Sequence, residues 1–303
     1  MADISASLVK ELRDETGAAM MDCKKALVEA EGNKDKAREL LRARGVAVAT
    51  KKANRATSEG LVVTAIAKDH KTGVIAEVNC ETDFVARNEE FVKLANEVAG
   101  AALQAKAKDP AAVLTQKMGA NTVQEVLTEK VAKTGENMGV RRLNYMEVSG
   151  PGVVGSYVHA LGGKMGCLIE IKGTKEASNQ DELAAVAREV AMHITSAKPQ
   201  FVNRSEVPAA IIENERRIEM ERDDLKSKPE NIRAKIVEGR VDKLLAERCL
   251  LDQPFIKDPS KTIQQLLQEK GKALGTDLTP VKFALYILGE DSGESSNGDG
   301  HND

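Results

Sequence analysis

The sequence is poor in aromatic residues, has no excess of either charge, and lacks long apolar runs. It has no Trp, and aromatic residues make up 3% of its 303 residues, so stacking platforms for bases or sugars are not expected. Its 44 Lys and Arg residues nearly balance 47 Asp and Glu residues, whereas nucleic-acid and membrane-surface binders normally carry a basic excess. No stretch approaches the ~18 apolar residues of a membrane span, and no signal peptide is visible. We therefore expect a cytoplasmic protein without a direct nucleic-acid or membrane partner.

The spacings typical of metal and redox sites are also missing. Cys23, Cys80, Cys167 and Cys249 are scattered and form no CxxC pair, which favours buried, reduced thiols. None of the four histidines has a neighbour at the spacing of metal ligands. His193 stands beside apolar residues and is expected to be a hydrogen-bonded core histidine. We expect no metal, no other cofactor and no catalytic residue.

Residues 1–55 are expected to form an N-terminal domain of three helices. Gly17 ends the first helix, and Met20 begins the apolar stripe of the second, which continues at helical spacing. A third apolar stripe is followed by Gly45, which stands where a helix C-cap belongs. Three short helices bury little area, so this domain would be marginally stable alone.

A strand–turn–strand–helix pattern occurs twice and predicts an α+β core. In the first core subdomain, residues 56–150, two β-branched runs form a hairpin, and the helix that follows begins at the cap residue Asn88. The pattern returns in the second core subdomain, residues 151–205, where Glu170 aligns with Glu77. We interpret this as an internal duplication that gives two packed α+β halves.

Residues 206–251 are predicted to form a projecting antiparallel helical hairpin. Ile211 and Ile218 lie at heptad spacing, as in the seam of a coiled coil. Pro229 suits the first position of the returning helix, whose apolar stripe includes Leu244. A merely solvated charged face is an equally good interpretation of any single charge in this segment.

Two further segments complete the chain. Residues 252–290 are expected to complete the core and to form a C-terminal module, with one helix and one strand. Residues 291–303 are rich in Ser, Gly and Asp, and we expect a disordered tail.

One string resembles an enzyme motif. Residues 150–155 match G-x-G-x-x-G, but a dinucleotide fingerprint needs a strand before it and a helix after it. Here a strand precedes and another strand follows, so we interpret the string as the turn of a hairpin. This context counts against an enzyme that binds a dinucleotide at the turn.

Residues 82–89 join the second strand of the first hairpin to its helix, and they carry an acidic residue next to an aromatic one. In a structural interpretation, Asp83 caps a turn and Phe84 fills the core. In a functional interpretation, both side chains are exposed at the tip of an element, as an anchor and a charge suited to a partner's crevice. Composition alone favours the structural interpretation.

Two longer motifs change this weighting. One contains Thr16-Gly17 and Met20-Met21-Asp22-Cys23-Lys24-Lys25-Ala26-Leu27, and the other is Glu77-Val-Asn-Cys-Glu-Thr82-Asp83-Phe84-Val85-Ala86. Together they resemble the two signature regions of the bacterial elongation factor Ts family, the guanine-nucleotide exchange factors for elongation factor Tu. The stretches 191–194, 237–240, 253–256 and 259–262 are also similar to the family. The resemblance covers nearly the whole chain except the tail, and it departs at Glu81, where a neutral Gln is common.

The resemblance implies an α+β fold whose N-terminal three-helix domain is of the ubiquitin-associated type. It further implies a core of two related α+β subdomains, a projecting antiparallel coiled-coil hairpin, and a C-terminal module that returns to the partner. It places the side chains of Asp83 and Phe84 near the partner's magnesium and phosphate site. The partner-binding residues implied by the resemblance are Arg13, Met20, Met21, Lys24, Thr82, Asp83, Phe84, Val85, His159 and Ile256.

The resemblance therefore predicts a translation elongation factor. Such a factor binds elongation factor Tu in its GDP-bound and nucleotide-free states and promotes GDP release, so that GTP can rebind. It transforms no substrate of its own, so we expect neither enzyme activity nor a small-molecule substrate. The alternative is a non-catalytic helical-hairpin adaptor with a ubiquitin-associated-type domain, and the presence of both motifs in one chain counts against it.

Overall fold

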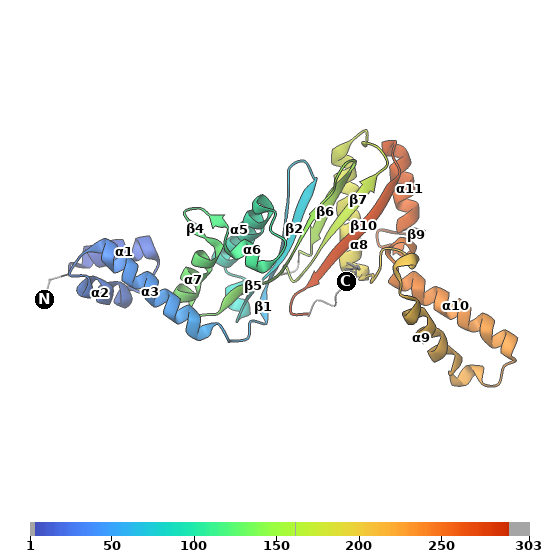
Figure 1. Ribbon diagram of the computed structural model, residues 1–303, viewed down its shortest axis with the longest axis horizontal. Coiled ribbons are helices and arrows are strands. Elements are labelled where there is room, and N and C mark those ends of the chain that lie inside the picture. Colours follow the sequence, from blue (N-terminus) through green and yellow to red (C-terminus); the bar gives the residue numbers. More distant parts are fainter. Residues whose placement is uncertain (1–3, 161, 291–303) are drawn as a thin grey trace, which may run out of the picture. The chain divides into compact units, whose positions relative to one another are not determined.

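Helices and strands are both abundant in the protein, as expected of a mixed α and β fold (Figure 1). The computed structural model describes residues 4–160 and 162–290. In this part of the chain, no helix combines the length and the apolar content needed to cross a bilayer. The segment predicted to be a disordered tail, residues 291–303, lies outside the described residues.

The chain forms two compact units. The first comprises the residues up to Ala65, Val74–Tyr145 and Gly162–Lys164, and the second comprises Ile66–Gly73 and the rest of the chain after residue 145. Each unit has its own apolar core, so each can be described by itself.

Three helices begin the first unit: α1 (Ala6–Thr16), α2 (Met20–Glu29) and α3 (Lys34–Lys52). The hydroxyl of Ser5 caps α1 by accepting the N–H of Leu8, and Gly17 ends α1 in the left-handed conformation with φ of 65°. Cys23 and Leu27 form the buried stripe of α2, but Met20 is 51% exposed. The prediction that Met20 belongs to the core stripe is therefore wrong.

The first sheet has the strand order β1-β2-β5, with β1 at Glu59–Ile66, β2 at Thr72–Cys80 and β5 at Met138–Glu147. Between β2 and β5 the chain forms α4 (Asp83–Ala86), α5 (Glu89–Ala105), α6 (Pro110–Leu114), β3 (Lys117–Met118), β4 (Asn121–Thr122) and α7 (Val123–Thr134). The predicted cap Asn88 accepts the N–H of Glu90 at 2.8 Å. The apolar faces of α5 and α7 pack with β2 in one core.

The prediction that Gly45 ends a helix is wrong, because α3 continues through it to Lys52. Gly45 is buried, and a Cβ atom at this position would lie 3.3 Å from the Cβ of Ala132 in α7. The glycine therefore permits close approach of α3 to α7. In the sequence, a glycine with this packing role cannot be told from one that ends a helix.

The second unit contains the sheet β10-β7-β6, in which β7 pairs antiparallel with both neighbours. Its strands are β6 (Gly152–Val158), β7 (Met165–Gly173) and β10 (Leu278–Ile287), and its remaining globular elements are α8 (Gln180–Ala197), β8 (Pro254–Phe255), β9 (Asp258–Thr262) and α11 (Ile263–Leu274). Helices α8 and α11 supply apolar side chains to its core.

The two sheets follow the same order of elements. Apart from the short helices α4 and α6 in the first and the inserted helices between α8 and β8 in the second, each has a hairpin, a long helix, a short two-stranded pair, a helix with a capping box, and a third strand. In each, the central strand carries a buried glutamate that pairs with a cation on the third strand. The carboxylate of Glu77 accepts a hydrogen bond from the Nε of Arg142 at 2.7 Å. The carboxylate of Glu170 lies 3.6 Å from the Nζ of Lys282.

Two helices, α9 (Ala209–Met220) and α10 (Glu230–Arg248), lie between α8 and β8 in the chain and pack against each other (Figure 1). The sequence pattern predicted the wrong residues for part of the apolar contact between α9 and α10. The buried residues of α10 are Val237, Val241 and Leu245, so Leu245 and not Leu244 belongs to the stripe, while Ile218 is 46% exposed. Pro229 precedes α10 as its cap and does not occupy its first turn.

The G-x-G-x-x-G string begins between β5 and β6 and ends within β6; the two strands belong to different sheets, so the string is not the turn of a hairpin. Two of its glycines have packing roles. At Gly152, φ is 135° and a Cβ atom would lie 2.4 Å from the carbonyl oxygen of Ile171. At Gly155, a Cβ atom would lie 2.5 Å from the Cβ of Ala187 in α8. Since a strand follows the string, no helix N-terminus is available for a pyrophosphate.

Candidate partner-binding site

The predicted site Thr82–Val85, called here the wedge loop, begins where the buried strand β2 ends. Phe84 is 84% exposed, more than any other large apolar side chain that the structure describes. The hydroxyl of Thr82 caps the short helix α4 by accepting the N–H of Val85 at 3.4 Å. The structural interpretation is therefore wrong on both counts, because Phe84 does not fill the core and Asp83 does not provide the cap.

Two carboxylates hold the wedge loop to the connection between α7 and β5. Glu136 accepts the backbone N–H of Thr82 at 3.0 Å and its hydroxyl at 2.6 Å, one with each oxygen. In the opposite direction, Glu81 accepts the backbone N–H of Asn137 at 2.6 Å. Hydrogen bonds to a charged acceptor are stronger than neutral ones, so this reciprocal pair fixes the start of α4.

The acidic residue of the wedge loop stands at the surface. The carboxylate of Asp83 lies 3.0 Å from the guanidinium of Arg87, whose side chain is 79% exposed. Exposed ion pairs contribute only about 0–1 kcal/mol. The ion pair with Arg87 therefore constrains the carboxylate of Asp83 only weakly.

The thiol beneath the wedge loop is not reactive. Cys80 is buried, and its Sγ donates to the carbonyl oxygen of Thr82 at 3.2 Å. Burial raises the pKa of Cys80 to about 12, so the thiol stays neutral near pH 7 and is a poor nucleophile. All four cysteines are buried and free, as predicted from their spacing.

The four N-terminal site residues occupy the adjoining ends of α1 and α2. Arg13 lies in the last turn of α1, and its carbonyl oxygen accepts the N–H of the capping Gly17 at 2.7 Å. Met20 and Met21 are 51% and 61% exposed at the start of α2, and Lys24 is exposed one turn later. The helix ends therefore present two apolar and two basic side chains to solvent.

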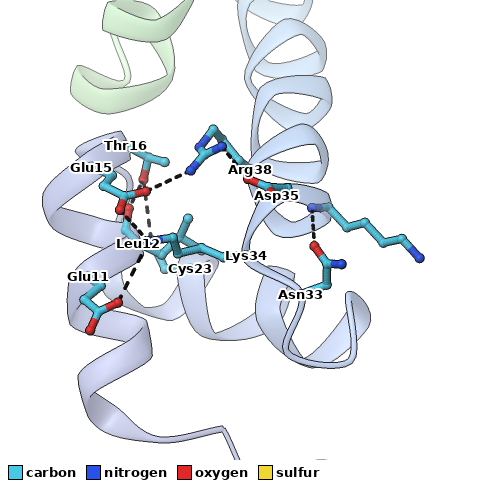
Figure 2. Close-up of polar contacts among 10 residues, drawn as sticks. Glu11, Leu12, Glu15, Thr16, Cys23, Asn33, Lys34, Asp35 and Arg38 are labelled. Carbon is cyan, nitrogen blue, oxygen red and sulfur yellow. Dashed lines mark hydrogen bonds and ion pairs between the residues drawn. The ribbon is translucent and has the colours of Figure 1, made fainter.

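One of the two helices that carry these residues, α1, is joined to α3 by ion pairs. Figure 2 shows the carboxylate of Glu15 between Lys34, at 2.6 Å, and Arg38, at 3.0 Å. Hydrogen bonds from Lys34, and next from Arg38, lower the pKa of Glu15. The hydroxyl of Thr16 donates to the carbonyl oxygen of Leu12 at 2.7 Å, which fixes the last turn of α1 before Gly17 (Figure 2).

His159 and Ile256 belong to the second compact unit. His159 follows the end of β6, is partly exposed, and makes an edge-to-face contact with Tyr157 at 6.5 Å between ring centroids. Ile256 lies between β8 and β9 and is 46% exposed. Its backbone N–H donates to the Nδ1 of His193 at 3.3 Å.

The prediction that His193 is a hydrogen-bonded core histidine is confirmed. Its ring is 1% exposed, and its Nε2 lies 2.9 Å from the Oε1 of Gln253. Since Nδ1 accepts from Ile256, Nε2 carries the proton and donates to Gln253. Burial lowers the pKa of His193. This neutral histidine holds the segment that presents Ile256.

Around the wedge loop lie backbone and carboxylate groups that donate and accept hydrogen bonds. Among residues 4–160 and 162–290, no group of three or more His, Cys, Asp or Glu side chains is placed to hold a metal ion. Sequence reasoning missed Glu136 and Asn137, which lie 54 and 56 residues from their partners in the wedge-loop region. No local pattern marks them.

Comparison with known proteins gives a uniform result. Residues 81–290 match the protein family described as Elongation factor TS. Elongation factor Ts of Clostridium perfringens (strain SM101 / Type A) is 46% identical over 288 residues, which cover 95% of this chain and 93% of that protein. Elongation factor Ts of Nostoc punctiforme is 44% identical over 299 residues, covering 96% and 94% of the two chains. That of Rickettsia peacockii is 43% identical over 292 residues, covering 95% and 93%.

The region that matches the family contains the wedge loop from Thr82 to Val85, and each of the three relatives covers 95–96% of this chain. The chain therefore belongs to the elongation factor Ts family.

Proposed function

We propose that the wedge loop enters elongation factor Tu and that this chain thereby promotes GDP release. The chain is a translation elongation factor that acts as a nucleotide exchange factor for elongation factor Tu. One observation supports the role of the wedge loop more than any other: Phe84 is 84% exposed on a loop that Glu136 holds by two hydrogen bonds. An exposed, rigidly held aromatic side chain is a typical anchor at a protein interface.

The mechanism follows from linkage between two binding equilibria. A GTPase holds GDP through backbone N–H groups of its phosphate loop and a magnesium ion. A factor that binds the nucleotide-free state more tightly than the GDP state must weaken GDP binding by the same ratio. The chain therefore needs no bond chemistry, and we propose that it has no enzyme activity and no small-molecule substrate of its own. GTP then refills the site and displaces the factor.

In this proposal, Asp83 and Phe84 have different tasks. Phe84 provides the apolar anchor, and its ring occupies volume in the partner near the nucleotide site. Asp83 brings a carboxylate, which repels phosphate oxygens and is a ligand type that magnesium prefers. The cap of α4, in which the hydroxyl of Thr82 accepts the N–H of Val85, fixes the backbone that carries Asp83 and Phe84.

Phe84 alone provides too little energy for exchange. Full burial of a Phe side chain stabilises a complex by about 1.5–3 kcal/mol, whereas a nanomolar nucleotide complex represents about 12 kcal/mol. Several contacts must act together, and we propose three further ones. They are the N-terminal group Arg13, Met20, Met21 and Lys24, the core residue His159, and the C-terminal residue Ile256.

The proposed contacts fit a modular chain. We propose an N-terminal domain of the ubiquitin-associated type (1–55), two core subdomains (56–150 and 151–205), a coiled-coil hairpin (206–251) and a C-terminal module (252–290). The shared element order of the two sheets supports an origin of the core by duplication. Because translation takes place in the cytoplasm, we propose that location for the chain.

The linkage itself can be tested by titration. The affinity of the chain for elongation factor Tu is measured without nucleotide and with excess GDP and magnesium. The proposal predicts that GDP weakens the protein complex, and that the chain weakens GDP by the same factor. Equal affinity in both conditions would contradict exchange and would favour a simple adaptor, which binds without regard to nucleotide.

A further inference from the structure

The short connection between α7 and β5, residues 135–137, contacts two separate parts of the first compact unit. Glu136 holds Thr82 of the wedge loop with both carboxylate oxygens, at 3.0 and 2.6 Å. The side-chain amide of Asn137 donates to the carbonyl oxygens of Ala53, at 3.2 Å, and Arg55, at 2.9 Å, just beyond the end of α3. The carbonyl oxygen of Gly135 accepts the ammonium group of Lys52. One connection therefore links the wedge loop to the end of the helix that leaves the N-terminal domain.

The contact with Glu136 determines how Thr82 acts as a cap. A threonine hydroxyl has one proton to donate and can accept with its lone pairs. Because that proton is directed to Glu136 at 2.6 Å, a lone pair is left to accept the N–H of Val85 at 3.4 Å. Glu136 thus orients the hydroxyl that begins α4.

Helix α4 has only four residues, and a helix this short is not stable by itself, since nucleation costs more than one turn of hydrogen bonds returns. Its order depends on its caps and on contacts such as that of the buried Ala86. A loop that must order itself on binding loses part of its interaction energy, and a preformed loop keeps it.

We propose that Glu136 is a positioning residue for nucleotide exchange, which acts by holding Phe84 and Asp83 in their binding arrangement before elongation factor Tu is met. This inference rests on the proposed function of the wedge loop. The other proposed contacts supply affinity that does not depend on the order of α4. Loss of Glu136 should therefore lower the maximal rate of GDP release from the saturated complex more than it changes the concentration of factor needed for half-maximal rate.

Two isosteric substitutions separate this role from a general effect of charge. In Glu136→Gln, one of the two accepting oxygens is replaced by an NH2 group, which cannot accept, so the N–H or the hydroxyl of Thr82 loses its acceptor. In Glu97→Gln, the same charge is removed from the exposed face of α5, where Glu97 lies 3.7 Å from Lys93 of the same helix. We expect the maximal rate of GDP release to fall about three- to tenfold in Glu136→Gln, the effect of one hydrogen bond, and to change less than about twofold in Glu97→Gln, which loses only an exposed ion pair.

A double-mutant cycle with Phe84→Ala is the deciding test. If Glu136 acts through Phe84, Glu136→Gln lowers the rate in the wild-type background and changes it little in the Phe84→Ala background. An equal loss in both backgrounds would overturn the inference, because it would indicate a general structural effect. A normal rate in Glu136→Gln, together with a slow rate in Phe84→Ala, would overturn the inference about Glu136 but not the proposed function of the wedge loop. A normal rate in Phe84→Ala would overturn the proposed function of the wedge loop itself.

Hydrogen exchange and a second variant show whether a loss of rate in Glu136→Gln comes from the wedge loop or from misfolding. In free Glu136→Gln, the amides of residues 82–85 should exchange faster than in the wild type, while the amides of β2 stay protected. If Glu136→Gln does not fold, Thr82→Val removes the same hydroxyl contact from the other side, and it should show the same loss of rate and the same dependence on Phe84. Unchanged exchange at residues 82–85 in a folded variant would contradict the positioning role.

Discussion

Phe84→Ala separates folding from exchange more cleanly than other substitutions in this chain. In the free protein the Phe84 side chain is 84% exposed, so its removal should change the free energy of unfolding by no more than about 0.5 kcal/mol. In the complex, loss of its burial costs about 1.5–3 kcal/mol. If all of this energy is used to weaken GDP, the loss corresponds to a reduction of about 10- to 150-fold in the rate of GDP release.

The assay follows labelled GDP leaving elongation factor Tu by stopped flow over a range of factor concentrations, with thermal unfolding as a check on folding. Ile232→Ala serves as a control, since Ile232 is an apolar side chain of α10 that is 45% exposed and has no role in the proposal. A rate in Phe84→Ala equal to that of the control would refute the reasoning. So would a large drop in unfolding temperature, because it would mean that Phe84 supports the fold.

The remaining predictions concern the tail, a buried histidine and a packed glycine. Deletion of Asp291–Asp303 should leave GDP release unchanged, and a large loss would show that the tail takes part. Burial lowers the pKa of His193 below 6.5, so the unfolded state binds the proton more readily, and the free energy of unfolding should fall as pH drops below that value. In urea titrations, His193→Gln should show a shallower fall, and a parallel fall would contradict the assignment. Gly155→Ala brings a Cβ atom to 2.5 Å from that of Ala187 and should cost about 1–3 kcal/mol of stability, as measured by denaturant unfolding; an unchanged midpoint would argue against tight packing there.

Local patterns in the sequence predicted the elements well and their ends less well. The caps Gly17 and Asn88 were recognised correctly, because each lies next to the backbone groups it satisfies. Gly45 was misjudged because the same residue serves two purposes, helix termination and close helix packing, and only the position of Ala132 decides between them. The burial of Ile218 was predicted wrongly because heptad spacing describes the apolar stripe of α9 alone. It does not show how far along that stripe α10 packs against α9.

The wedge loop shows the same limit at the candidate site. Local sequence identified Asp83 and Phe84 as neighbours, but composition favoured a buried, capped turn for them, because an Asp and a Phe after a strand fit such a turn well. The decision depends on Thr82 and Glu136, which are 54 residues apart in the chain and meet through tertiary contacts. Such a pair has no local signature.

The central claim is that this chain accelerates nucleotide release by another protein. The most direct measurement is the rate at which labelled GDP leaves purified elongation factor Tu, in the presence of magnesium, with and without this chain. The account predicts that catalytic amounts of the chain accelerate release strongly when unlabelled nucleotide is in excess. A rate that is the same with and without the chain, although the two proteins bind, would contradict the account.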